Sequence, residues 1–104
     1  MKRFMIKYRF ANGTESDWHA EIARFIAELD SDPILAGRVS YRCMRIKGDP
    51  AYYHLATAAD DDAGRALNES PFFKRYTEAT RRVAEGGRVE VTPMEIIGET
   101  KRPA

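Results

Sequence analysis

The pattern of apolar residues predicts an α+β domain with the element order β-α-β-β-α-β, which is the ferredoxin-like arrangement. Four segments alternate between apolar and polar residues with the period of a strand, and two regions carry apolar residues at helical spacing. With 104 residues, the chain is long enough for one domain, residues 1–104, with a single core. We therefore expect a four-stranded antiparallel sheet with the helices on one face.

The first strand and the first helix follow each other directly. Residues 4–10 alternate in polarity and are rich in aromatic residues, which favours a strand. Thr14 lies three residues before Asp17, a spacing typical of a helix N-cap. The helix should run over residues 15–30 and end before Asp32-Pro33, because residues before proline disfavour helical dihedrals. Its apolar stripe consists of Trp18, Ile22, Phe25, Ile26 and Leu29.

The next two strands are predicted as a hairpin over residues 38–47 and 51–58, joined by the turn Gly48-Asp49-Pro50. A turn centred between Gly48 and Asp49 places two cross-strand pairs on one face. These pairs are Cys43 with His54 and Arg45 with Tyr52.

The helical region from residue 60 to residue 85 is interrupted once. Three aspartates at 60–62 favour a helix start, while a metal site would need further ligands that the sequence does not place. Ser70 is predicted to cap the following helix, which begins at Pro71. Its inward residues should be Phe72, Tyr76, Ala79 and Val83, and it should end at Gly86-Gly87.

The last strand is predicted over residues 88–97, at the edge of the sheet. Pro93 lacks an N–H donor and is tolerated in edge strands or bulges. The middle strands carry apolar residues toward both faces, for example Tyr41 on one face and Met44 on the other. Because both faces should then be buried, we expect a homodimer in which a second copy covers the face without helices.

Composition excludes some classes of function. Lys plus Arg total 17 and Asp plus Glu total 16, and this balance argues against general binding to nucleic acids or membrane surfaces. The N-terminal apolar residues are interrupted by Lys7 and Arg9, unlike a signal peptide, and no window is apolar enough to span a bilayer. The single Cys43 cannot form an internal disulfide. We expect a cytoplasmic protein.

The stretch from residue 55 to residue 76, LATAADDDAGRALNESPFFKRY, resembles the antibiotic biosynthesis monooxygenase family. The matching positions are Asp60, Ala63, Ser70, Pro71 and Phe73. The resemblance implies a dimeric α/β barrel, in which two ferredoxin-like sheets face each other around a cavity. It also suggests oxidation of a quinol-like substrate without a metal or flavin cofactor.

Three positions depart from the family pattern. Ala58 stands where many members have Trp, and Leu67 where many have His. Haem-degrading members bind iron through a His at the position of Thr77. The resemblance therefore does not predict haem degradation.

Because Ala58 matches a pocket-facing position of that family, the face that contains residues 52, 54, 56 and 58 is expected to line the cavity. Packing of the apolar side of the first strand on the helices should send its basic residues into the same cavity. The predicted substrate-binding residues, for an anionic or phenolic small molecule, are Lys7, Arg9, Tyr41, Cys43 and Tyr52, with His54 as the candidate catalytic base.

Several of these residues also have structural interpretations. His54 has an unperturbed pKa near neutrality, as a general base needs, but a half-buried strand also accommodates a hydrogen-bonded histidine. A Cys43–His54 nucleophile pair is a further alternative, against a buried cysteine with only a packing role. Two His and one Cys are too few for a zinc site.

Three functions remain open at this stage. The first is a cofactor-independent monooxygenase for a small aromatic or quinol-like molecule, and the second is a non-redox binding or isomerase-like protein on the same barrel. RNA-recognition domains share the element order, but they need aromatic residues in a set pattern on the third strand. The run Lys47-Gly48-Asp49-Pro50-Ala51-Tyr52-Tyr53 does not fit that pattern, which argues against RNA binding.

Overall fold

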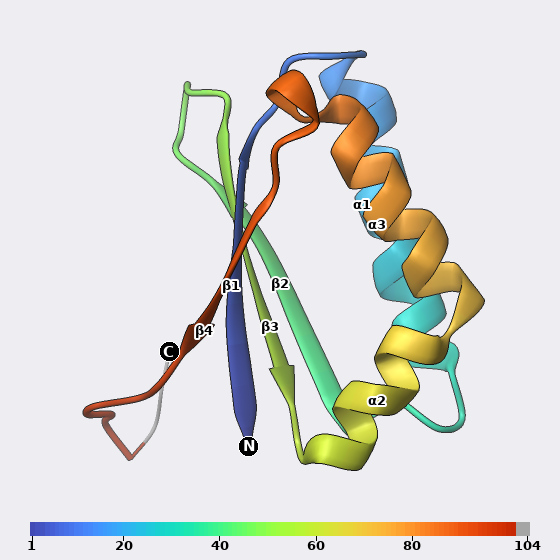
Figure 1. Cartoon of the computed structure of the whole chain (residues 1–104), viewed down its shortest axis with the longest axis vertical. Coiled ribbons are helices and arrows are strands. Elements are labelled where there is room, and N and C mark those ends of the chain that lie inside the picture. The colour runs from blue at the N-terminus through green and yellow to red at the C-terminus, as the bar shows by residue number, and fades with distance from the viewer. Residues whose placement is uncertain (102–104) are drawn as a thin grey trace.

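The strands and helices follow the predicted order. The computed structural model describes residues 1–101 (Figure 1). Its elements are β1 (Lys2–Arg9), α1 (Glu15–Ser31), β2 (Val39–Arg45), β3 (Ala51–Ala58), α2 (Asp61–Glu69), α3 (Pro71–Val83), the 3₁₀ turn η1 (Glu85–Gly87) and β4 (Glu90–Met94). The predicted break at Ser70-Pro71 separates α2 from α3. β2 and β4 are shorter than predicted, whereas β3 has the predicted bounds.

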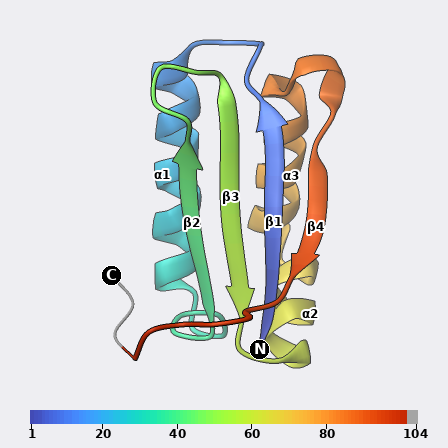
Figure 2. The same ribbon diagram turned by 90° about the vertical axis from the view of Figure 1, so that its left-hand side faces the viewer.

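The four strands form one antiparallel sheet in the order β2-β3-β1-β4, as the ferredoxin-like prediction requires. The helices cover one face of this sheet, and Figure 2 shows the other, which we call the open face. After β4 the chain crosses the lower ends of β1, β3 and β2 on the open face. β4 is an edge strand, which confirms the position predicted from Pro93. No helix within residues 1–101 is long and apolar enough to cross a membrane.

The register of β1 corrects one prediction. Tyr8 pairs with Tyr52 and Ile6 pairs with His54, so the apolar side of β1 shares the helix-covered face with His54. Lys7 pairs with Tyr53 and therefore points to the opposite, open face, as Arg9 does. The prediction that Lys7 and Arg9 share a cavity with His54 was wrong, because directly paired residues of an antiparallel ladder point to the same face.

The hairpin register was predicted correctly. Cys43 lies opposite His54, and Arg45 lies opposite Tyr52. However, this face packs beneath the helices. The prediction that it would face the sheet of a second subunit was therefore wrong.

Caps begin the first two helices as expected. The Thr14 hydroxyl accepts a hydrogen bond from the Asp17 N–H at 3.2 Å, and Asp60 accepts one from the Ala63 N–H at 2.8 Å. Ser70 differs from the prediction, because its hydroxyl donates to the Leu67 carbonyl at 2.8 Å instead of capping α3. Ser70 thus closes α2, and Pro71 begins α3 without a side-chain cap.

Aromatic residues dominate the core between the helices and the sheet. Phe25 of α1 stacks on Tyr76 of α3, with ring centroids 3.9 Å apart. Trp18 also stacks on Tyr76, and it meets Tyr8 edge to face. Stacking and edge-to-face pairs of this kind add about 0.5–1.5 kcal/mol each beyond the burial of their surface. Tyr76 thereby joins both helices to the sheet.

The N-cap of α1 provides a test of the fold assignment. Thr14→Ala removes the acceptor for the Asp17 N–H and should lower the free energy of unfolding by about 1 kcal/mol. Thr14→Ser keeps the hydroxyl and should retain most of that stability. Urea unfolding followed by circular dichroism measures both values. Equal losses for the two variants would contradict a capping role for this hydroxyl.

Candidate functional site

His54 lies at the centre of the sheet, and three tyrosines surround its ring. The side chain is completely buried. The Tyr8 hydroxyl lies 2.9 Å from Nε2, while the Tyr41 and Tyr76 hydroxyls lie 3.2 Å and 3.3 Å from Nδ1. These three side chains come from β1, β2 and α3. The sheet pairing and the packing of α3 together create the cluster.

A tryptophan extends this cluster toward α1. The Trp18 Nε1–H donates to the Tyr8 hydroxyl at 2.8 Å. Among the described residues, every buried side-chain nitrogen and oxygen has a hydrogen-bond partner. Satisfied networks of this kind hold a core in one arrangement, because each unpaired buried polar atom would cost free energy.

Burial keeps the whole cluster uncharged near neutral pH. It lowers the pKa of His54 to about 4, because the imidazolium form loses its hydration. The same loss of hydration raises the pKa values of Tyr8, Tyr41 and Tyr76 well above the usual range. At pH 7 the site therefore contains a neutral imidazole and three neutral phenols.

An apolar cavity of about 200 Å³ adjoins two of these tyrosines, between the sheet and α3. We call it the α3 cavity. It is lined by Phe4, Ile6, Tyr41, Ala56, Leu67, Phe73, Tyr76, Thr77, Thr80, Arg81, Val89 and Val91. Ligand pockets are usually larger, roughly 300–1,000 Å³, so the α3 cavity suits a small ligand.

The polar groups of the α3 cavity are few. The Thr80 and Thr77 hydroxyls donate to the backbone carbonyls of Tyr76 and Phe73, at 2.8 Å and 2.9 Å. Arg81 is the one charged residue among the described residues that line the cavity. Apolar walls with Arg81 and two tyrosines would suit an aromatic ring that carries an oxygen substituent.

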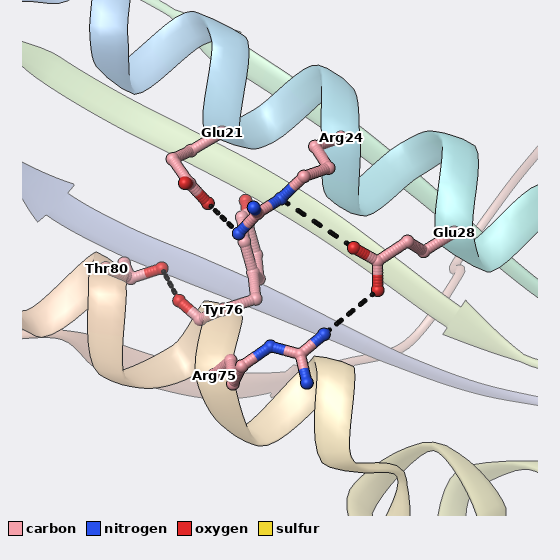
Figure 3. Close-up of polar contacts among 6 residues, drawn as sticks. All are labelled: Glu21, Arg24, Glu28, Arg75, Tyr76 and Thr80. Atoms are coloured by element: carbon pink, nitrogen blue, oxygen red, sulfur yellow. Dashed lines mark hydrogen bonds and ion pairs between the residues drawn. The ribbon is translucent and has the colours of Figure 1, made fainter.

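A group of ion pairs within α1, extended by one pair to α3, lies outside Tyr76 (Figure 3). Arg24 contacts Glu21 at 3.0 Å and Glu28 at 3.7 Å, and Glu28 contacts Arg75 of α3 at 3.4 Å. The two arginine side chains are largely exposed, so the individual contributions of these pairs to stability are small. The Glu28–Arg75 pair links the two helices on the solvent side of Tyr76.

Cys43 and Tyr52 lie beside a second recess, of about 250 Å³, between α1 and the β2 edge. The Tyr52 hydroxyl contacts His19 Nε2 at 2.8 Å and accepts from Arg45 at 3.4 Å. The Cys43 Sγ lies 3.8 Å from the Tyr76 hydroxyl, and burial raises the pKa of the thiol to about 11. A thiol that stays protonated at pH 7 argues against the Cys43–His54 nucleophile pair.

The predicted site residues thus fall into separate groups. Tyr41 and His54 belong to the buried cluster, whereas Cys43 connects it to the second recess, where Tyr52 lies. On the open face the Lys7 ammonium lies 5.9 Å from the centre of the Tyr53 ring. Arg9 pairs with Glu85 at 3.5 Å, away from either recess. Within residues 1–101, no group of three or more His, Cys, Asp or Glu residues could hold a metal ion.

Sequence reasoning missed four residues of the site. Tyr8, Trp18 and Tyr76 were expected on the apolar faces of their strand or helices, and Arg81 was not considered. The alternation of polarity along β1 could have indicated Tyr8, because it places Tyr8 on the side of the strand that shares a face with His54 once β1 pairs with β3. The sequence contains no local signal for Tyr76, which reaches the sheet from α3.

The buried His54 makes stability depend on pH. Its pKa is about 4 in the folded protein and 6.5 when unperturbed, so the unfolded chain takes up a proton first as the pH falls. The stabilisation is complete above pH 6.5 and is lost as the pH falls toward 4, by about 3 kcal/mol in total. Urea titrations between pH 7 and pH 4 should show this loss.

Carboxylates also titrate in this range, so a matched comparison is needed. His54→Gln should remove the contribution of His54 to the pH dependence of the free energy of unfolding, and His19→Gln, at an exposed position, is the matched control. If His54→Gln has the same pH dependence as the unmodified protein, the low pKa of His54 is contradicted.

Comparison with known proteins shows the fold. No family model and no curated protein matches the chain. Among solved structures, a mutant of SnoaB, a cofactor-independent oxygenase from Streptomyces nogalater, aligns over 97% of each chain, with 20% identity and a TM-score of 0.75. An antibiotic biosynthesis monooxygenase aligns over 94% of this chain and all of its own, with 11% identity and a TM-score of 0.74.

A third solved structure is a dimeric ferredoxin-like protein of unknown function from Jannaschia sp. It covers 92% of this chain and 100% of its own, with 19% identity and a TM-score of 0.65. These similarities extend over nearly the whole chain, although the sequence identities are 20% or lower. The chain therefore has the ferredoxin-like fold of SnoaB and of the antibiotic biosynthesis monooxygenase with which it aligns.

Proposed function

We propose that this chain is a cofactor-independent oxygenase, which oxidises a small phenolic or quinol-like molecule in the α3 cavity. The observation that carries the proposal is the apolar cavity beside Tyr41 and Tyr76, whose hydroxyls contact the buried His54. The fold shared with SnoaB, a cofactor-independent oxygenase, supports it. The size of the cavity favours a substrate with few rings.

In such a reaction the substrate supplies all the electrons. The ring carbon opposite the hydroxyl loses its hydrogen and gains an oxygen atom from O₂, and both oxygen-bearing carbons become carbonyls. The second oxygen atom of O₂ leaves as water, together with the hydroxyl and ring hydrogens. The substrate loses four electrons and O₂ gains four, so the reaction is balanced without another reductant.

The protein contributes by holding and activating the phenol. The phenolate is the electron-rich form that reacts with O₂, and hydroxyl donors in an apolar cavity stabilise a negatively charged oxygen better than water does. A phenol has a pKa of about 10, and His54 one of about 4. Proton transfer to His54 would cost about 8 kcal/mol, so His54 acts in this proposal by orienting the tyrosines that contact the substrate.

A non-redox binding or isomerase-like protein is the alternative function. The same cavity and tyrosines would serve it, because they bind an aromatic ligand whether or not O₂ reacts. Only turnover that depends on O₂ separates the two functions.

Oxygen uptake tests the proposed reaction. The protein mixed with a hydroxylated anthrone, or with a dihydroxynaphthalene that carries hydrogen on the ring carbon opposite one hydroxyl, should consume O₂ and form the quinone, with one atom of ¹⁸O₂ in the product. Tyr41→Phe should lower kcat/KM by roughly 10- to 100-fold, the effect of one hydrogen bond to a charged oxygen. Tyr53→Phe, on the open face, is the matched control and should retain full activity. Binding of these compounds without O₂ uptake would favour the non-redox alternative.

We also propose that a second copy of the chain covers the open face. This face and the segment after β4 expose apolar side chains, including Met44, Met94 and Ile96, which a second copy would bury. The dimeric ferredoxin-like protein from Jannaschia sp. supports a dimer of this fold. Pairing of two open faces would form a dimeric α/β barrel, with Lys7 and Arg9 near the interface.

A native mass spectrum tests the dimer. The unmodified chain should have twice the mass of one subunit at micromolar concentration. Met44→Glu, on the open face, should shift the population toward the monomer, because it places a charge in the apolar interface. Ile34→Glu changes a more exposed apolar residue outside the sheet and should leave the dimer intact. A monomeric unmodified protein would disprove this proposal.

A further inference from the structure

We infer that the α3 cavity binds its ligand as an aromatic anion, with the Tyr41 and Tyr76 hydroxyls as donors, and that Trp18 sets the direction of those donors through Tyr8 and His54. This inference rests on the ligand site of the proposed function, in which a phenolate reacts, and adds the residues that fix the direction of the hydrogen bonds to that anion. It also makes Trp18, Tyr8 and His54 positioning residues.

The donor and acceptor roles in this chain of hydrogen bonds are set first at Trp18. An indole N–H can only donate, so the Tyr8 oxygen accepts this hydrogen bond at 2.8 Å. The only other side-chain hydrogen bond of the Tyr8 hydroxyl in the described structure is the contact with His54 Nε2, at 2.9 Å. Its own hydrogen is therefore satisfied only when Tyr8 donates to Nε2. An unsatisfied hydroxyl hydrogen at this buried position would cost free energy.

The role of one His54 ring nitrogen fixes the role of the other. A neutral imidazole has one N–H and one acceptor nitrogen. Because Nε2 accepts from Tyr8, the proton of His54 lies on Nδ1, where the ring faces the Tyr41 and Tyr76 oxygens at 3.2 Å and 3.3 Å. His54 thus donates to these tyrosines, so their own hydroxyl hydrogens do not need His54 as an acceptor.

These two hydrogens have only neutral acceptors. The Tyr76 hydroxyl lies 3.8 Å from the Cys43 sulfur, and sulfur accepts hydrogen bonds only weakly. Tyr41 lies beside Tyr76 in the wall of the same cavity, and the two side chains share a hydrogen bond. An anionic oxygen would be a much better acceptor for both, since hydrogen bonds to charged groups are about twice as strong as neutral ones.

The surrounding charges favour the same ligand. Among the described residues that line the α3 cavity, Arg81 is cationic and none carries a carboxylate. The other titratable groups near the donors are Tyr8, His54 and Cys43, and each of them is neutral at pH 7. The cavity therefore contains donors and one cation, but no anion that would repel a phenolate.

The tautomer of His54 in the unmodified protein tests the inferred donor and acceptor roles. Protein labelled with ¹⁵N-histidine should show a neutral His54 with its proton on Nδ1 in a long-range ¹H–¹⁵N spectrum at pH 7. His19→Gln assigns the signals, because the chain has two histidines. A proton on Nε2 would overturn the inference.

A chromogenic nitrophenol tests the preference for an anion by binding alone. Its phenolate should bind about tenfold more tightly than the neutral phenol, so its pKa should fall by about one unit in the complex. Arg81→Gln and Tyr41→Phe should each reduce this fall, whereas Tyr53→Phe should not. An unchanged or raised pKa of the bound probe, or no binding, would overturn the inference.

Trp18→Phe tests the positioning role. Without the indole N–H, Tyr8 is free to accept from Nε2, so a mixture of His54 tautomers and a smaller fall in the pKa of the bound probe are expected. A variant that keeps the single Nδ1–H tautomer and the full pKa fall would contradict a role for Trp18. If this variant does not fold, the tautomer of the unmodified protein decides the direction.

The two proposals fail separately. If the unmodified protein consumes no O₂ but binds the phenolate more tightly than the phenol, the proposed oxygenase function is disproved and this inference stands. If it consumes O₂ but does not prefer the phenolate, this inference is disproved and the oxygenase function stands.

Discussion

The complete burial of His54 is the constraint on which the rest of this structure depends. An imidazole at the centre of a sheet must have both nitrogens hydrogen-bonded, because unpaired buried polar atoms are costly. The chain meets this requirement with hydroxyls from β1, β2 and α3. The sheet register and the position of α3 must both be correct before the cluster can form, so the fold and the site specify each other.

Tyr76 connects that cluster to the remainder of the core. One face of its ring stacks on Phe25, its hydroxyl reaches His54 and Cys43, and its side chain forms part of the α3 cavity. The same residue therefore contributes to helix packing, to the hydrogen-bond network and to the ligand site. A ligand in the cavity would contact a wall that is already held rigidly, which lowers the entropic cost of binding.

The fold similarity and the local chemistry support different parts of the functional argument. Structures such as SnoaB share the fold at 20% identity or less, and a fold hosts many activities. The choice of a phenolic ligand depends instead on the tyrosines, on Arg81 and on the apolar walls of this chain. Burial of His54 lowers its pKa to about 4, which turns the expected base into a hydrogen-bonding group.

Local patterns in the sequence were sufficient for the element order, the bounds of β3, the caps at Thr14 and Asp60, and the pairing of Cys43 with His54. Each depends on residues close together in the chain, where periodicity and turn chemistry act. Only the tertiary structure decided which face of the sheet holds the site and that Lys7 lies on the other face. It also decided the contacts of Tyr8 and Tyr76 with His54. Tyr8 and His54 are 46 residues apart, and their contact exists because β1 inserts beside β3 while α3 folds back over both. Pairing across such distances depends on the packing of the whole core, which no local pattern encodes.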